Sequence, residues 1–448
     1  MRSLRFSTIA LCFLVLGSCT SAVRKPPPGT ADFVPFNTFL QGVRSARYED
    51  YAGRPGVKVR DQAAFEEMRA HVLKMYDGVQ PVHTFVSDGA LFDCIAIASQ
   101  PAVRLLGLTR IERQPPASAV AGGYAAGRTP GDAKAIESPL RLGLKDPYGN
   151  RMSCVTETIP MARITLETMT RFTTLDDFFS KGPGGGGSPP PVRQGEIVPG
   201  GSDHLYAAGR QEPLTNFGGN SWLNLWTPTG GFTLSQQWYA GGTDGTVDHQ
   251  TVEGGWVVYK EKFNSDKPVL FIFYTADNYG TQKCYNLLCG KFVQTSSHHY
   301  LGGSWAQYSI TGGTQWGFEM QWKLFRGNWW LFIRGGGDYE ALGYYPTSIF
   351  NNGQMARNAT RVTYGGETAP PKPYPQMGSG EHASTGWQHA AFQKGIFYIP
   401  RDEDNGTGVW ASLTKLPTPS CYSIEITPSS EGGSWGTYFY FGGPGGNC

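Results

Sequence analysis

The sequence predicts a mainly β protein, in which an antiparallel β-sandwich follows a small α+β unit. Glycine supplies 60 of the 448 residues, about twice its usual share, and aromatic residues supply 13%. This combination favours many short strands and tight turns over helices. Residues 315–325 alternate apolar and polar side chains with the period of two expected of a strand with one buried face. No helical crossovers separate the strand-like runs after His204, which favours antiparallel pairing.

The amino-terminal end is typical of an export signal. Arg2 and Arg5 precede an apolar run over residues 6–16 that is too short for a stable bilayer anchor. The run ends in Leu-Gly-Ser-Cys, which resembles a bacterial lipobox whose cysteine, Cys19, becomes the lipidated first residue. The alternative is ordinary signal cleavage after Ala22. We therefore expect an exported protein, which is either a lipoprotein of the outer membrane or cell surface or is secreted after processing.

The small unit is expected to follow a Pro-rich tether over residues 20–35. Residues 61–77 predict a helix that begins at the cap Asp61 and ends at Gly78. One face of this helix is apolar and is expected to be buried. Residues 84–97 predict a strand, 113–134 a mobile Pro/Ala/Gly-rich loop and 164–179 a second helix.

Residues 181–201 interrupt this pattern with four successive glycines followed by three prolines, as in a flexible and then stiff linker. Such a stretch predicts a domain boundary and a site of proteolysis. The boundaries are therefore a signal at 1–19, a first unit at 20–180, a linker at 181–201 and a second unit at 202–448.

Short aromatic and β-branched runs alternate with turn residues throughout the second unit. The predicted strands cover residues 232–240, 251–260, 269–275, 305–310, 315–325, 329–334, 361–368, 387–399, 421–426 and 436–441.

Six cysteines lie outside the signal region, and an even number in an exported chain indicates disulfides. Their grouping along the chain favours the pairs Cys94–Cys154, Cys284–Cys289 and Cys421–Cys448. No Cys-x-x-Cys or His-Glu-x-x-His motif occurs, and His298-His299 lacks useful ligand spacing, so no metal or other cofactor is expected. The net charge is only +2 without a basic cluster, which argues against a nucleic-acid partner.

Two glycine-framed glutamates, Glu253 and Glu367, lie in or beside predicted strands. A carboxylate in such a place is costly unless it is exposed, paired or used. Two of them brought together can share a proton and activate a water, which is sufficient to hydrolyse an amide. The alternatives are a solvent-facing residue on an edge strand for Glu253 and a loop residue for Glu367. Glu319, also in a strand, is expected to be solvated or to face substrate.

Six segments in order resemble the neprosin family of glutamic peptidases. Four segments surround Cys284 (residues 284–294), Trp329 (329–331), Tyr344 (342–346) and Met377 (376–380). The other two are Glu253-Gly-Gly-Trp-Val-Val-Tyr and Tyr364-Gly-Gly-Glu. In the first unit, the segments at 92–95, 100–102, 154 and 158–161 resemble the family's activation peptide. The lipoprotein-type signal, the 113–134 loop and the Gly/Pro linker depart from the plant pattern and suggest a bacterial homologue.

The resemblance implies a secreted zymogen whose catalytic domain is an antiparallel β-sandwich with Glu253 and Glu367 as the catalytic pair. It also implies a prolyl endopeptidase that is active in acid and takes proline-containing peptides or proteins as substrates. We expect a monomer that meets the membrane only through a lipid at Cys19. One glutamate takes a proton from water while the other, protonated, polarises the scissile carbonyl; which is base and which is acid stays open.

Further expectations concern the surroundings of the pair. The neighbouring glycines leave room for a substrate backbone, and Trp256 or Trp238 is a candidate wall of a proline pocket. Prolines of the linker, at 189–191 and 199, offer a site for self-cleavage, although cleavage by another protease, or no cleavage, is equally open. Gly432-Gly-Ser-Trp-Gly436 fits the G-x-S-x-G pattern of serine hydrolases, but no helix follows to form the required elbow.

Two other function classes compete with the peptidase. A glycosidase also uses two carboxylates and sugar-stacking aromatics. A non-enzymatic surface protein binds a partner through its sandwich and does not need either glutamate.

Overall fold

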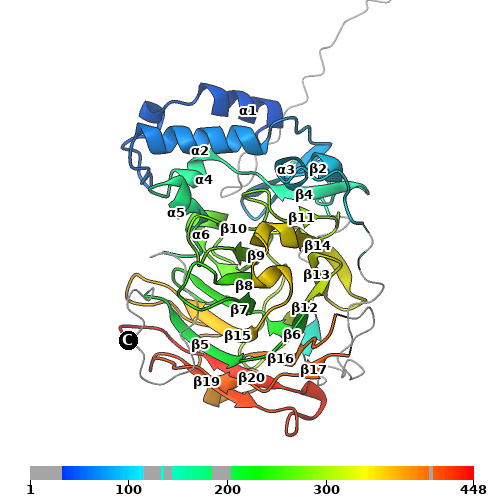
Figure 1. Cartoon of the computed structure of the whole chain (residues 1–448). Coiled ribbons are helices and arrows are strands. Elements are labelled where there is room, and N and C mark those ends of the chain that lie inside the picture. The colour runs from blue at the N-terminus through cyan, green and yellow to red at the C-terminus, as the bar shows by residue number, and fades with distance from the viewer. Residues whose placement is uncertain (1–32, 114, 116–132, 136–143, 184–202, 403–406) are drawn as a thin grey trace, which may run out of the picture.

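A computed structural model describes residues 33–113, 115, 133–135, 144–183, 203–402 and 407–448 (Figure 1). The predicted signal, the lipidation site Cys19, most of the tether and the linker prolines lie outside the described residues, as does most of the 113–134 loop. No helix within the described ranges is long and apolar enough to cross a membrane.

The N-terminal unit, residues 33–183, packs helices beside a small antiparallel sheet. The sheet has the strand order β1 (His83–Ser87), β2 (Ala90–Ala96), β4 (Thr158–Ala162). Two longer helices, α1 (Phe36–Ser45) and α2 (Gln62–Met75), lie at the top of the molecule in Figure 1. The described part of the unit also contains the short helices α3 (Pro101–Leu105), α4 (Leu166–Met169) and α5 (Leu175–Phe179) and two 3-10 turns, Tyr48–Asp50 and Ile97–Ser99.

Helix α2 forms as predicted. The Asp61 carboxylate accepts a hydrogen bond from the Ala64 amide at 2.8 Å, and this cap satisfies one of the free N–H groups of the first turn. The predicted apolar face is buried, and Gly78 has a φ of +69°, which favours glycine just beyond the helix end.

Two other predictions for this unit were wrong in detail. Residues 84–97 form not one strand but the hairpin β1–β2, because Asp88 and Gly89 turn the chain with φ of +45° and +82°. Residues 164–179 form not one helix but α4 and α5. Thr165 and Thr174 each accept a hydrogen bond from an amide three residues on, so two separate helix starts replace a continuous helix.

The β-rich unit, residues 203–448, consists of two sheets that are antiparallel apart from one short strand. The first sheet has the order β10 (Lys283–Tyr285), β9 (Val269–Thr275), β8 (Gln250–Val258), β7 (Thr233–Gly241), β15 (Arg361–Thr368), β5 (Leu205–Gln211), β18 (Thr414–Lys415). The second has the order β11 (Val293–Gln294), β14 (Glu340–Pro346), β13 (Asn328–Arg334), β12 (Gln315–Phe325), β6 (Gly218–Asn224), β16 (Ala391–Tyr398), β20 (Tyr438–Gly442), β19 (Ser423–Thr427).

Two further strands join the second sheet. Strand β17 (Val409–Trp410) pairs with β16, and β3 (Ala133–Ala135), from the N-terminal unit, pairs parallel with the start of β12. The mainly β, antiparallel fold class is therefore confirmed. Helix α6 (Lys260–Phe263) is a single turn between β8 and β9.

Three strand predictions are confirmed to the residue. Strands β9, β12 and β15 have the predicted bounds. The predicted strand at 305–310 is absent: the Trp305 ring stacks on Phe318 at 4.9 Å, and the segment runs as irregular chain against the sheet. Strands β5, β6 and β14 were missed because each contains glycine and small residues that lower strand propensity.

The two sheets pack face to face. Trp256 of β8 donates a hydrogen bond from Nε1 to the Asn224 carbonyl of β6 at 2.9 Å. Gln237 of β7 likewise donates to the Met320 carbonyl of β12 at 2.9 Å. One face of the first sheet therefore belongs to the core between the sheets, and the N-terminal unit packs near its opposite face.

Disulfides join Cys94 to Cys154, Cys284 to Cys289 and Cys421 to Cys448, with Cα–Cα distances of 5.4, 6.3 and 5.8 Å. These are the pairs favoured by the grouping of cysteines along the chain. The first bond ties β2 to the segment before β4 within the N-terminal unit. The other two lie within the β-rich unit.

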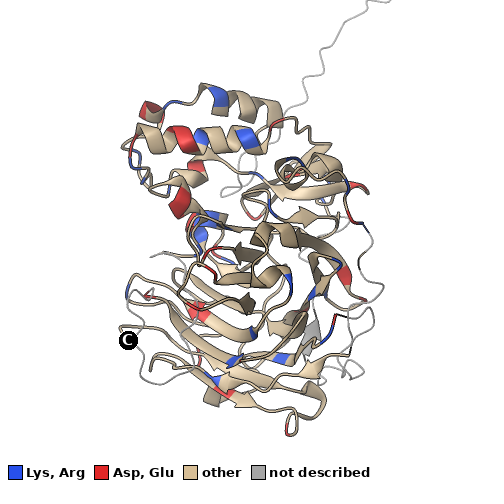
Figure 2. Cartoon of the chain, in the orientation of Figure 1, with Lys and Arg blue, Asp and Glu red and all other residues tan. Residues whose placement is uncertain are grey.

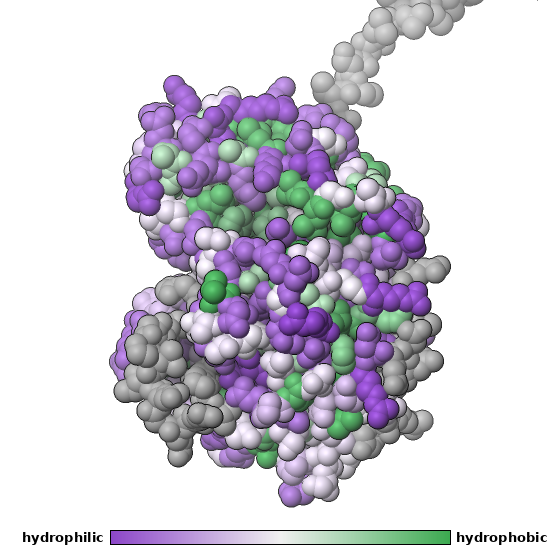
Figure 3. Space-filling view, in the orientation of Figure 1, coloured by the Kyte–Doolittle hydropathy of each residue, from purple (hydrophilic) through white to green (hydrophobic). Residues whose placement is uncertain are grey.

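Charged residues are conspicuous on the helices of the N-terminal unit, whereas the strands of the β-rich unit carry few (Figure 2). Figure 3, in the orientation of Figure 1, shows apolar residues gathered below α1 and α2. A cavity of about 460 Å³ has walls from both units, including Phe39, Leu91, Ile164, Phe263 and Leu288.

Candidate active site

One lysine bridges the two glutamates that the sequence singled out. The Nζ of Lys181 lies 2.7 Å from Glu253 Oε2 and 2.7 Å from Glu367 Oε2. The two carboxylate oxygens therefore cannot be further apart than twice that distance. All three side chains are fully buried, so the ammonium group is the charge that allows two carboxylates to share one buried place.

The register of three strands brings the glutamates to one side of the first sheet. Glu253 on β8 lies opposite Trp238 of β7, and Glu367 on β15 lies opposite Leu234 of the same strand. Directly paired residues and every second residue along a strand share a face. Glu253, Glu367 and the intervening Gln236 of β7 therefore point to the face that does not pack on the second sheet.

Glu253 accepts hydrogen bonds at both carboxylate oxygens. Its Oε1 accepts from the hydroxyls of Thr251 and Tyr279, both at 2.8 Å, and its Oε2 accepts from Gln236 Nε2 at 2.9 Å. Burial and the neighbouring Glu253 charge raise the pKa of Tyr279 well above its usual value, so its hydroxyl remains a donor. This set of donors fixes the orientation of the carboxylate.

Glu367 is held by a cationic environment. Burial acts to raise its pKa, but the Lys181 charge and the hydrogen bond from His204 outweigh burial, and the pKa of Glu367 is lowered. His204 Nδ1 lies 2.5 Å from Glu367 Oε1, and its Nε2 donates to the Pro183 carbonyl at 3.0 Å. The two ring nitrogens of His204 thus connect Glu367 to the chain at Pro183.

Residues 175–183, here called the occluding segment, place Lys181 in this site. The Tyr285 hydroxyl donates to the Lys181 carbonyl at 2.5 Å, and the Trp238 ring lies 4.9 Å from the lysine Nζ. A Cβ on Gly182 would come within 2.9 Å of the His204 ring, so the segment passes very close to the site. The segment thus occupies the space in front of both glutamates.

Of the two tryptophans that are candidate walls of a proline pocket, only Trp238 lies on the same face of the sheet as Glu253. Trp238 also contacts the occluding segment. Trp256 was a wrong candidate because it lies three residues beyond Glu253 on β8, which places it on the opposite face in the core between the sheets.

The glycines beside the glutamates do not leave room for substrate, contrary to expectation. A Cβ on Gly254 would lie 2.9 Å from Met320 Sδ, and one on Gly366 would lie 2.5 Å from Met377 Sδ. A Cβ on Gly255 would lie 2.0 Å from the Ser235 carbonyl of the neighbouring strand. These glycines permit close packing of strands and sheets.

The remaining candidate residues lie in other arrangements. Glu319 accepts hydrogen bonds from Asn220 Nδ2 and Arg334 Nε, both at 2.7 Å, and so is neither fully solvated nor joined to the glutamate pair. His299 Nε2 lies 2.8 Å from Glu340. Within the described ranges no group of three or more His, Cys, Asp or Glu side chains is placed to hold a metal ion. Residues 433–435 form a single 3-10 turn.

Sequence reasoning missed Lys181, His204, Gln236 and Tyr279. A lysine at the start of a glycine-rich stretch looks like a linker residue, and a histidine one residue before a strand carries no pattern of its own. Gln236 and Tyr279 are recognisable only once the pairing of β7 with β8 is known.

A protein-family model matches most of the β-rich unit. The family model for neprosin matches residues 229–444, which include both glutamates. Residues 229–444 are a neprosin domain. Lys181 and His204 lie outside the matched residues, so the neprosin domain supplies the glutamates while the preceding chain supplies the two basic side chains that contact Glu367.

Three solved structures are similar to the chain at low identity. Two are crystal structures of scytalido-glutamic peptidase, one with a transition-state analogue inhibitor and one with a peptide-based analogue, at TM-scores of 0.31 and 0.30 and identities of 7% and 8%. The third is SCP-B, a member of the eqolisin family of peptidases, in complex with the tripeptide Ala-Ile-His, at a TM-score of 0.28 and 8% identity. Each comparison covers 53% of this chain and 98% of the other.

Proposed function

We propose that the neprosin domain is a glutamic peptidase that uses Glu253 and Glu367, and that residues 33–183 keep it in a latent, zymogen form. The family match supports a peptidase. The observation that carries the proposal is the placement of Lys181 Nζ at 2.7 Å from both carboxylates. A buried ammonium group between two glutamates stands where a water molecule and a scissile peptide would have to bind.

Hydrolysis would follow departure of the lysine. Two carboxylates this close cannot both stay ionised cheaply, so the pair takes up one proton and titrates as a unit. The ionised carboxylate removes a proton from water, whose oxygen attacks the carbonyl carbon of the peptide. The protonated carboxylic acid polarises the carbonyl oxygen, and a proton passes to the leaving amine as the C–N bond breaks.

In the latent form, the occluding segment fills the hydrogen-bonding groups around the glutamates. The occluding segment contributes the Lys181 ammonium and the carbonyls of Lys181 and Pro183, which accept from Tyr285 and His204. A peptide substrate has carbonyls of the same kind. Tyr285 and His204 therefore act as donors to the substrate backbone once the segment leaves.

Replacement of either glutamate tests the catalytic pair. We expect Glu253→Gln and Glu367→Gln to lower peptide hydrolysis by a factor of about 100 or more, because a glutamine of the same shape neither takes nor gives the proton. The full chain is incubated at pH 3–7 with a mixed-peptide digest, and cleavage sites are mapped by mass spectrometry. Glu319→Gln serves as the matched control. Undiminished hydrolysis by both site variants contradicts the proposal.

Post-proline specificity and acid activity belong to the same proposal. The same digest tests them: we expect cuts at low pH that cluster after proline. Cuts without a common residue would remove the prolyl assignment and leave the peptidase. Release of soluble glycans without any peptide cleavage would instead favour a glycosidase.

Self-cleavage in the 181–201 linker is a separate part of the proposal. Acid incubation of wild-type protein is expected to create a new amino terminus within the linker, whereas Glu253→Gln is not. A terminus that forms equally fast in both proteins assigns the cleavage to another protease.

Removal of the bridging charge tests latency. We expect Lys181→Met to lower the stability of the full chain by about 3–5 kcal/mol, the usual result of breaking a buried ion pair from one side. The variant is expected to hydrolyse peptides at a higher pH than wild type, because the segment no longer neutralises the carboxylates. Thermal unfolding and a peptide assay measure the two effects. Lys260→Met, which removes an exposed lysine paired with Asp266, is the control.

A further inference from the structure

Two lysines of the β-rich unit contact the occluding segment close to the glutamate pair. Lys262 lies on α6 and Lys283 begins β10. Both side chains are almost fully buried, with 5% of each residue exposed. Neither takes part in the hydrolysis described above, and each has its principal partner on the occluding segment.

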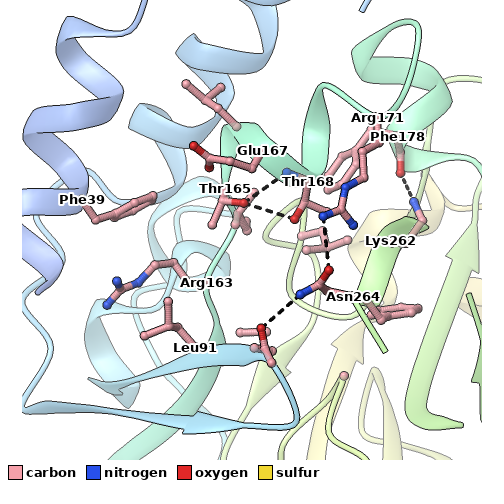
Figure 4. Close-up of a pocket in the computed structure, with 18 of the residues that line it drawn as sticks. Phe39, Leu91, Arg163, Thr165, Glu167, Thr168, Arg171, Phe178, Lys262 and Asn264 are labelled. Atoms are coloured by element: carbon pink, nitrogen blue, oxygen red, sulfur yellow. Dashed lines mark hydrogen bonds between the residues drawn. The ribbon is translucent and has the colours of Figure 1, made fainter. Parts of the chain in front are cut away.

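Lys262 is a buried amine without a carboxylate partner among the described residues. Its Nζ donates to the Phe178 carbonyl, a contact drawn in Figure 4. The rings of Phe172, Phe178, Tyr259 and Tyr285 surround the Nζ at 4.6–5.5 Å. Burial, and then the charge of Lys283, lower the pKa of Lys262 well below its usual value. Burial therefore makes the protonated form of Lys262 less favourable than it is in water.

Lys283 binds an acidic side chain of the occluding segment. Its Nζ lies 2.9 Å from both carboxylate oxygens of Asp176 and also donates to the Gly280 carbonyl. The lysine side chain is only 4% exposed, whereas that of Asp176 is 59% exposed. Lys283, the buried member of this ion pair, therefore belongs to the β-rich unit. Asp176, the exposed member, belongs to the occluding segment.

Tyr285 connects these lysines to the catalytic site. The Tyr285 ring lies 5.1 Å from Lys262 Nζ, while its hydroxyl donates to the carbonyl of Lys181, whose side chain bridges the glutamates. Tyr285 and Glu253 both pair directly with Phe273 of β9, so they share one face and one row of the sheet. The lysines thus flank the path that the segment follows to the glutamates.

We propose that Lys262 and Lys283 form a cationic subsite that, once the occluding segment has left, binds an acidic side chain of the peptide substrate. This inference rests on the proposed peptidase function. Loss of the segment removes the Phe178 carbonyl from Lys262 and the Asp176 carboxylate from Lys283. It leaves both lysines without these acceptors, and Lys262 keeps the rings of Tyr259 and Tyr285 beside it. Water that enters in place of the segment relieves the burial that lowers the pKa of Lys262, so an acidic side chain can pair with the lysines in place of Asp176.

The spacing predicts where the acid lies in a substrate. Asp176 precedes Lys181 by five residues, but residues 175–179 are helical and rise only about 1.5 Å per residue. An extended peptide rises about 3.3 Å per residue and spans the same path with fewer residues. In a substrate that runs in the direction of the segment, the acid is expected roughly two to four residues on the amino-terminal side of the scissile bond.

The test measures hydrolysis of peptide pairs that differ only by Glu or Gln at one position. The full chain is first activated by acid and then assayed at about pH 5, where the peptide glutamate remains ionised. We expect kcat/KM to be about tenfold higher for the Glu peptide at one of these positions, since a hydrogen-bonded charge of this kind is worth about one decade. The same exchange on the other side of the scissile bond is expected to have little effect.

Variants assign the preference to the two lysines. Lys262→Met and Lys283→Met are expected to reduce the Glu-to-Gln ratio toward one, whereas Lys260→Met on the same short helix leaves it unchanged. An active enzyme without an acidic preference, or with one that survives both variants, overturns the inference and leaves the peptidase proposal standing. Absence of hydrolysis of every peptide instead overturns the peptidase proposal.

A second measurement does not require activity. In the Glu253→Gln background, Asp176→Asn is expected to increase hydrogen exchange of the β10 amides, because the acid that fills the subsite is lost. Asp177→Asn removes the same charge one residue away and is the matched control. Equal exchange in the two variants contradicts occupation of the subsite by Asp176.

Discussion

At the scale of single residues, Lys181 and His204 decide the charge of the site. The Lys181 Nζ lies 2.7 Å from a carboxylate oxygen of each glutamate, and His204 Nδ1 lies 2.5 Å from the second oxygen of Glu367. Glu367 therefore contacts two basic side chains inside the protein. These two contacts explain how Glu367 has a lowered pKa although burial alone acts to raise it.

The lowered pKa of Glu367 predicts a stability change with pH. A carboxyl group with a depressed pKa contributes stability above its unfolded value of about 4.5, and this contribution is lost as the pH falls through the folded value. His204→Gln removes one of the depressing charges and raises the folded pKa. We expect the variant to lose stability at a higher pH than wild type, by about 1.5–3 kcal/mol in total.

Thermal unfolding between pH 3 and 7 measures the His204 effect. His389→Gln, which removes an exposed histidine beside Glu381, is the control and is expected to follow wild type. A His204→Gln curve that is parallel to wild type at every pH shows that His204 does not influence Glu367.

At the scale of elements, the sequence predicted the strands that carry the glutamates but not the arrangement that joins them. Alternation predicts the bounds of β12, and a short run of aromatic and β-branched residues between turn residues predicts those of β15. The approach of Glu253 to Glu367 depends on which strands neighbour β7 and in what register, and neither is visible in a local pattern. Lys181 reaches the site through α5, which the sequence placed inside one long helix.

Adjacent glycines of β8 are expected to respond differently to a methyl group. In Gly254→Ala the new Cβ meets the flexible end of Met320, so repacking limits the cost to about 1–3 kcal/mol. In Gly255→Ala the Cβ meets the Ser235 carbonyl at 2.0 Å, and β7 and β8 must separate. We expect Gly254→Ala to fold with a lower Tm and Gly255→Ala to lose much more. Equal Tm values contradict this account.

At the scale of the whole molecule, contacts outside the occluding segment also hold the two units together, among them the buried hydrogen bonds of the Gln100 side chain with the Gln294 backbone and the packing of Phe92 on Tyr300. Another is made by His71 of α2, whose Nε2 donates to the Leu288 carbonyl of the β-rich unit at 2.8 Å. Burial lowers the pKa of His71 to about 4, with the nearby Lys74 acting in the same direction. The histidine is thus docked in its neutral form.

Acid is therefore expected to weaken the docking of the N-terminal unit. When the unit separates, His71 regains a pKa near 6.5, so the free form gains a proton as the pH falls below that value, and the effect is complete near pH 4. The weakening reaches at most roughly 3 kcal/mol. His71→Gln keeps a donor to Leu288 and is expected to need a lower pH for release.

Size-exclusion chromatography of linker-cleaved protein across pH 4–7 measures this release. The control is His83→Gln, because His83 contacts Arg151 within its own unit. A release profile that is identical in wild type and His71→Gln excludes His71 as a pH-sensitive contact.

The burial of Lys181 also provides a reporter that needs no mutation. Trypsin-like proteases cut after lysine, and the Lys181–Gly182 bond is protected as long as the lysine side chain is fully enclosed between two carboxylates. A cut at this bond requires the segment to leave its place and extend into a protease cleft. In the wild-type protein, the rate of tryptic cleavage after Lys181 therefore reports the fraction of molecules in which the occluding segment has left the site.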